Sequence, residues 1–156
     1  MINKSPDYRV REWNRRCGKF PQQGGSEEYW ESLNKQLDRV LEEAEEIREA
    51  IEKRDSENLL KELCDLSVVS SGLNYLSNLN LEEAIHKVLD DNDHKYTTNK
   101  SLAEDWRFYW ARCGVKVKVS WSVIEGVTYY SVMRIPDGKI MKVPKRQTLD
   151  LTNLID

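Results

Sequence analysis

The sequence lacks long hydrophobic runs, a glycine-rich phosphate loop and any closely spaced cysteines. Its apolar runs are only a few residues long, which excludes a transmembrane helix, and residues 1–6 lack the apolar stretch of a signal peptide. The absent phosphate loop excludes nucleotide binding of the Walker kind. The three cysteines, Cys17, Cys64 and Cys113, are scattered and form no metal motif, so we expect free thiols and a cytoplasmic protein.

The remaining composition is that of one folded, highly charged domain. The chain has 156 residues, enough for one domain with a real core, and its 39% hydrophobic content argues against disorder. Charge is unevenly distributed, because residues 27–65 are acidic overall and residues 115–156 are basic overall. Such a chain has the charges to hold a metal ion and an anionic ligand together.

Helical periodicity dominates the first 90 residues. It predicts helices over residues 6–17, 26–53, 57–77 and 81–89, separated by short breaks that contain capping residues. Ser26 is a suitable N-cap for the second helix, and Asn80 with Glu83 resembles a capping box for the fourth. We therefore expect an antiparallel helix bundle in this part of the chain.

The pattern changes to β after residue 114. Alternating or β-branched residues predict strands over residues 115–121, 127–135 and 140–143, with turns at Ile124-Glu125-Gly126 and at residues 136–139. The predicted fold class is mainly α, with four to five helices and a small C-terminal β-meander. We expect a helical core over residues 1–100 and an extension over residues 101–156. Its aromatic cluster, residues 106–110, is expected to pack the extension on the helices rather than to bind nucleic acid.

Two acidic motifs carry most of the functional information. Residues 42–46 read E-E-A-E-E and residues 62–65 read E-L-C-D, with 15 residues between them. Carboxylates three residues apart share one helix face, so a hairpin of the two helices would bring four of them together. Mg²⁺ prefers oxygen ligands and would neutralise this charge. The four candidate ligands are Glu43, Glu46, Glu62 and Asp65.

The alternative is that these carboxylates belong to ordinary solvated helix faces. Apolar stripes run beside both motifs, at residues 40, 44, 47 and 51 and at residues 59, 63, 66, 69 and 73. The motifs therefore lie at the edge of a core, where an unpaired carboxylate is costly to desolvate. No basic residue falls within either motif, which favours a metal as the partner.

These motifs resemble the signature of the MazG-like all-α NTP pyrophosphohydrolase superfamily, E-E-x-x-E followed by E-x-x-D. Cys64 stands where relatives often have glycine. A further N-x-x-K element is similar to residues 92–95, and a later D-G-K-x-x-K element is similar to residues 137–142. The helix over residues 6–17 is similar to the opening helix of the family.

The resemblance implies an Mg²⁺-dependent enzyme, with Mn²⁺ as a substitute, that hydrolyses a nucleoside triphosphate to the monophosphate and pyrophosphate. It implies Mg²⁺ on the four carboxylates above, water activation by Glu42 or by a ligand carboxylate such as Glu43, and substrate contacts from Asn92, Lys95, Lys139 and Lys142. The two late lysines also suit a solvated strand edge.

Other readings of the activity stay open. They are a phosphoribosyl-ATP pyrophosphohydrolase and a catalytically silent nucleotide-binding or regulatory module. The family also implies a homodimer or homotetramer. We expect no membrane partner and no nucleic-acid partner, and the sequence does not define the base or sugar of the nucleotide.

Overall fold

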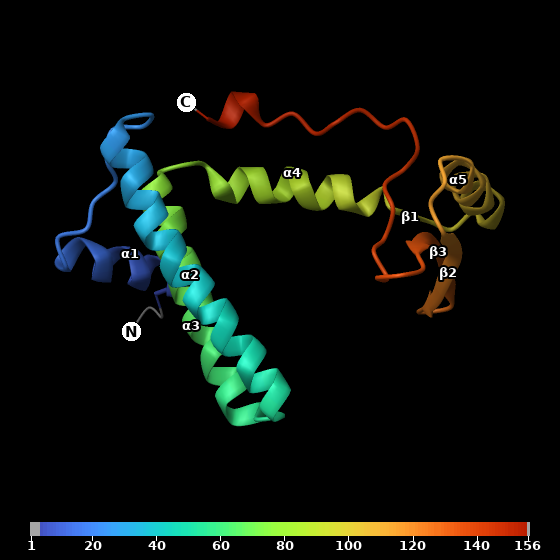
Figure 1. The fold of residues 1–156 in the computed structure, drawn as a ribbon. Coiled ribbons are helices and arrows are strands. Elements are labelled where there is room, and N and C mark those ends of the chain that lie inside the picture. Colours follow the sequence, from blue (N-terminus) through green and yellow to red (C-terminus); the bar gives the residue numbers. More distant parts are fainter. Residues whose placement is uncertain (1–3, 156) are drawn as a thin grey trace. The chain divides into compact units, whose positions relative to one another are not determined.

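The structure, a computed structural model, describes residues 4–155 and divides into two compact units (Figure 1). Residues up to Leu79 form the first unit, and residues from Asn80 onward form the second. The first unit is helical, whereas the second combines helices with a small antiparallel sheet. The predicted fold class, mainly α with a C-terminal β region, is confirmed. The predicted division near residue 100 stays a prediction about functional domains.

Three helices build the first unit: α1 (Pro6–Arg16), α2 (Glu27–Lys53) and α3 (Ser56–Ser77). Each starts at a capping side chain. Ser5, Ser26 and Asp55 accept hydrogen bonds from backbone N–H groups of the first helical turn. A two-residue break folds α2 back on α3 as a hairpin (Figure 1), as predicted. The break is tight because Arg54 adopts a left-handed conformation, with φ of 55°.

Polar groups hold the three helices at one level of the hairpin. Gln36 of α2 donates a hydrogen bond across to the carbonyl oxygen of Val69 in α3, at 2.9 Å. Buried Asn14 of α1 lies beside the same place. Gly72 makes this approach possible, because a Cβ there would lie 3.0 Å from Gln36 Nε2. The packing fixes the rotation of α2 against α3, and hence which side chains face each other.

The second unit contains α4 (Leu81–Asp93), β1 (Tyr96–Thr97), α5 (Lys100–Arg112), β2 (Val117–Ile124), β3 (Val127–Arg134) and a 3₁₀ turn, η1 (Thr152–Leu154). The predicted capping box of α4 is confirmed: Asn80 accepts from the Glu83 N–H, and its amide donates to the Glu83 side chain. Along α4, the C-terminal segment is attached by Lys87–Asn153 and Arg146–Asp91 contacts.

Helix α5 was not predicted as a separate helix. It starts at Asn99, whose side chain caps Leu102 N–H, and buries Ala103 completely. The helix contains the aromatic cluster and packs against β2 and β3 of its own unit. Trp110 Nε1 donates to the Lys142 carbonyl oxygen at 2.9 Å. At least this aromatic side chain therefore has a structural role, whereas Phe108 stays exposed.

The sheet has the order β1-β3-β2 and is antiparallel. The β2–β3 hairpin is confirmed, with positive φ at Glu125 and Gly126 as a two-residue turn requires. The third predicted strand, residues 140–143, is wrong as a strand, since only a bridge between Ile140 and Met133 forms. β1 pairs with residues 130–131 on the edge of β3 that faces away from β2. Residues 140–143 can therefore pair only with the end of that edge.

None of the helices within residues 4–155 combines the length and the apolar character that a membrane span needs.

Candidate active site

Three of the four predicted metal ligands come together on one face of the α2–α3 hairpin. Carboxylate oxygens of Glu43, Glu62 and Asp65 all lie within 4.8 Å of one another. Glu46 lies one turn after Glu43, outside this group of three, and its carboxylate is a neighbour of Glu62. The i,i+3 spacing of each motif aligns its two carboxylates, and the hairpin sets the two pairs opposite each other. We call these four residues the acidic cluster.

Glu62 is the buried member of the acidic cluster. Only 3% of its surface is exposed, and its Oε2 atom has no hydrogen-bond partner among the described residues. A buried carboxylate oxygen without a partner costs several times the free energy of an ordinary lost hydrogen bond. The folded chain keeps this atom unpaired at the position where two further carboxylates converge.

The carboxylates of the acidic cluster repel one another. Burial, followed by the charges of Asp65 and Glu62, raises the pKa of Glu43 above its ordinary value. The hydrogen bond with Glu62, together with the charge of that residue, raises the pKa of the exposed Glu46. Both shifts have the direction expected when like charges share a site without a sufficient counter-charge.

One cation, Lys61, reaches the acidic cluster and was missed in the sequence. Its Nζ lies 2.9 Å from Glu62 Oε1 and 3.4 Å from Asp65 Oδ2. Lys61 lies just outside the second motif, immediately before Glu62 and four residues before Asp65. That i,i+4 spacing was a usable signal. Lys61 is 64% exposed and carries one charge, so it neutralises only part of the cluster.

The donor set fits a hard divalent cation. All candidate ligand atoms are carboxylate oxygens, which Mg²⁺ and Mn²⁺ prefer, and the unpaired Glu62 oxygen gives a buried anchor beside half-buried Glu43 and Asp65. No cysteine or histidine belongs to the group, so a zinc centre does not suit it.

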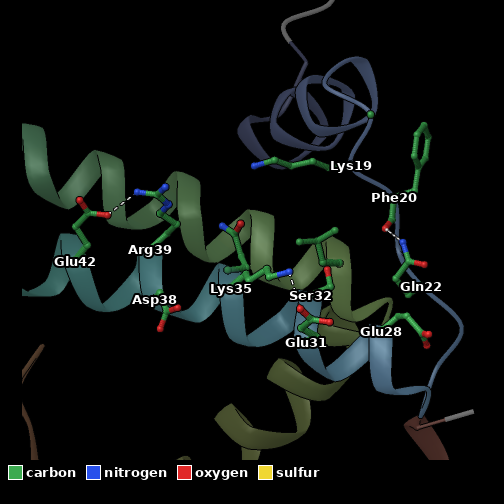
Figure 2. Close-up of a pocket in the computed structure, with 13 residues that line it drawn as sticks. Lys19, Phe20, Gln22, Glu28, Glu31, Ser32, Lys35, Asp38, Arg39 and Glu42 are labelled. Carbon is green, nitrogen blue, oxygen red and sulfur yellow. Dashed lines mark hydrogen bonds and ion pairs between the residues drawn. The ribbon is translucent and has the colours of Figure 1, made fainter.

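Glu42, the other predicted catalytic residue, lies elsewhere on α2. Its carboxylate pairs with Arg39 at 2.9 Å. This pair lines a cleft of about 770 Å³. Figure 2 shows Lys19 and Phe20, in the segment after α1, across this cleft from α2. This cleft shares none of the four residues of the acidic cluster. The structure therefore brings Glu43 into the acidic cluster and directs Glu42 away from it.

The four predicted substrate residues lie in the second unit, and two of them, Lys95 and Lys142, line a small cavity at the end of α4. The cavity, about 60 Å³ in volume, is lined by Asp91, Lys95, Lys142, Arg146 and four less polar neighbours. Asn92 accepts a hydrogen bond from Lys95 Nζ and so orients that lysine. We call this the basic cavity. Lys139 does not line it and lies in the turn after β3.

Arg146 was not identified from the sequence, because no motif contains it. Its Nε donates to Asp91 at 2.8 Å, and this bond lowers the pKa of Asp91, with Lys142 and Lys95 adding to the effect. Three cations thus surround one carboxylate, which leaves a local excess of positive charge.

One protein-family model matches the part of the chain that contains the acidic cluster. Residues 18–92 match the family model described as phosphoribosyl-ATP pyrophosphohydrolase. The matched family is part of the MazG-like all-α NTP pyrophosphohydrolase superfamily, so the predicted resemblance is confirmed over these residues. The matched stretch includes both acidic motifs and Asn92, and it ends before Lys95 and the β region. No curated protein and no solved structure matched the chain.

Proposed function

We propose that the protein is an Mg²⁺-dependent nucleoside triphosphate pyrophosphohydrolase that converts an NTP or dNTP to the monophosphate and pyrophosphate. The observation that carries the proposal is the acidic cluster, with three carboxylates within 4.8 Å and a buried Glu62 oxygen that lacks a partner. Such a set is poorly suited to a solvated helix face. It suits a divalent metal, because the metal completes the missing interactions.

Glu43, Glu46, Glu62 and Asp65 would hold the metal. When bound, Mg²⁺ supplies a positive charge that neutralises triphosphate oxygens and polarises water. Of the two predicted residues for water activation, Glu43 suits the task better, since it belongs to the acidic cluster while Glu42 pairs with Arg39. Lys61 holds the carboxylates together when metal is absent, and it is exposed enough to swing away.

The basic cavity would bind phosphate groups of the substrate. Its volume of about 60 Å³ suits a group of phosphate size, and Lys95, Lys142 and Arg146 supply charge-assisted donors. Asn92 would act by holding Lys95 in place. Lys139 would also contact the substrate, from a position outside this cavity.

Phosphoribosyl-ATP is the second candidate substrate, because the family model that matches the chain is described by that activity. The reaction is the same hydrolysis of an α–β phosphoanhydride bond, so the acidic cluster would serve both substrates. Which of the two substrates the protein hydrolyses would depend on its contacts with the rest of the nucleotide, outside the phosphates.

A pyrophosphate-release assay tests the proposal. The purified chain is incubated with Mg²⁺ and with each common NTP and dNTP, and with phosphoribosyl-ATP, and pyrophosphate is measured through a coupled pyrophosphatase. We expect turnover on at least one nucleoside triphosphate. Turnover on phosphoribosyl-ATP alone would select the second candidate. No turnover on any nucleotide would favour a catalytically silent binding module.

We also propose that the helical units associate into a dimer or tetramer. Large apolar side chains stay exposed on both long helices, including Leu37, Leu41, Leu60, Leu63 and Val68. Faces of this kind normally pack against another surface. Light scattering at micromolar concentration is expected to give a mass above that of the monomer. A monomer at every concentration would contradict the association.

A further inference from the structure

Strand β2 is one of the two outer strands of the sheet, and one of its edges faces away from β3. No strand among the described residues of its unit pairs with that edge. The Ile135 N–H donates to the Lys116 carbonyl oxygen at 2.9 Å, and the register sets Val117 opposite Arg134. In an antiparallel ladder, hydrogen-bonded pairs alternate. The backbone N–H and C=O groups of Val117, Val119, Trp121 and Val123 therefore point away from β3.

This edge has little of the protection that edge strands usually carry. Over its eight residues β2 has one charged side chain, Lys118, and no proline. Trp121 is 67% exposed and Val123 is 57% exposed. An exposed, regular, apolar edge is a template for pairing with another strand, and natural proteins normally block it with charges, proline or a bulge.

We propose that β2 pairs antiparallel with β2 of a second copy of this chain, so that two three-stranded sheets become one continuous sheet. One register uses every outward-pointing residue: Val117 lies opposite the partner's Val123, and Val119 lies opposite the partner's Trp121. Its two-fold symmetry closes the pair as a dimer. Each hydrogen-bonded residue pair exchanges two bonds, which gives about eight bonds between the chains.

The side chains of this register favour a second copy as the occupant. Lys118 falls opposite the partner's Ser122, so no two like charges meet across the interface. Val119 and the partner's Trp121 form a β-branched–aromatic pair, a combination that stabilises antiparallel sheets. The surface lies outside residues 18–92 and involves none of the helical faces described above, so the inference does not depend on the proposed activity.

The first test is Val123→Pro in the full chain, with the mass of the particle measured by multi-angle light scattering. Proline removes an N–H that points outward, so the β2–β3 ladder keeps its bonds. Thr128→Pro is the matched control. Thr128 lies opposite Val123 at the same distance from the turn, and its N–H points away from β2. We expect Val123→Pro to halve the number of copies per particle and Thr128→Pro to leave it unchanged.

A charge pair at one position tests the register even if a proline variant fails to fold. Ser122→Lys places a cation opposite the partner's Lys118 and should weaken association about fivefold, whereas Ser122→Glu should strengthen it by a similar factor. Sedimentation equilibrium measures the association constant of each Ser122 variant. A monomeric wild type, an unchanged mass in folded Val123→Pro, or equal effects of the two Ser122 variants would overturn the pairing. Nucleotide hydrolysis per chain is expected to stay unchanged in all of these variants.

Discussion

The acidic cluster and the basic cavity both contain carboxylates and cations, but in opposite proportions. Among the residues that the structure describes, the carboxylates of the first share the cation Lys61 alone, and one buried oxygen of Glu62 has no hydrogen-bond partner. In the second, three cations surround the single carboxylate of Asp91. Among the described residues, neither set has enough opposite charge to balance it. Each set therefore suits a ligand of the opposite charge, a divalent cation for the acidic cluster and a phosphate group for the basic cavity.

The largest effect is expected from neutralising the acidic cluster. Glu62→Gln, Glu43→Gln and Asp65→Asn should each lower turnover by about tenfold or more, because each removes a charged oxygen ligand, and Glu46→Gln should follow the same trend. The assay is pyrophosphate release at saturating substrate. Glu49→Gln is the control, since Glu49 lies on α2 with Glu43 and Glu46 and its one ion pair among the described residues is with Lys53.

The same variants separate catalysis from folding. Without metal, neutralising one carboxylate removes repulsion, so the melting temperature should stay the same or rise slightly. Added Mg²⁺ should raise the melting temperature of the wild type by linkage and raise it less in the variants. Wild-type activity in Glu46→Gln and Asp65→Asn would contradict the metal role and return the motifs to ordinary solvated faces.

A smaller effect is expected at the basic cavity. Lys142→Ala and Arg146→Ala should each raise KM by several-fold, since each removes a charge-assisted donor to phosphate, and kcat should change less. Lys139→Ala is the comparison variant, because Lys139 lies outside the cavity. We expect a smaller KM change for it. Equal KM values for wild type and both cavity variants would show that this cavity does not bind substrate.

The smallest effect is expected at Lys61. Metal and lysine compete for the same carboxylates, so Lys61→Gln should raise the affinity for Mg²⁺ by a few-fold and enlarge the Mg²⁺-induced shift in melting temperature. Lys53→Gln serves as the control, because Lys53 has an equivalent pair with Glu49 away from the cluster. Weaker Mg²⁺ binding in Lys61→Gln would mean that Lys61 supports the site rather than shielding it.

More of the acidic cluster than of the basic cavity could be predicted from the sequence. The helix hairpin and the convergence of its carboxylates followed from periodicity, because i,i+3 spacing within one helix is a local property. The contacts of Lys61 were predictable in the same way, because it lies four residues before Asp65 on one helix. The contact of Arg146 with Asp91 was not predictable, because it joins residues 55 positions apart and Arg146 lies in an irregular segment. Likewise, β1 was missed because its two residues become a strand only by pairing with β3.

An anomalous diffraction map from crystals soaked in Mn²⁺ shows whether the acidic cluster binds a divalent metal. We expect a strong peak within coordinating distance of Glu43, Glu62 and Asp65, with Lys61 displaced from its present contacts. We also expect this peak to be lost in Glu62→Gln. Manganese peaks elsewhere on the protein, with none at the acidic cluster and Lys61 still bound to Glu62 and Asp65, would contradict a metal site there.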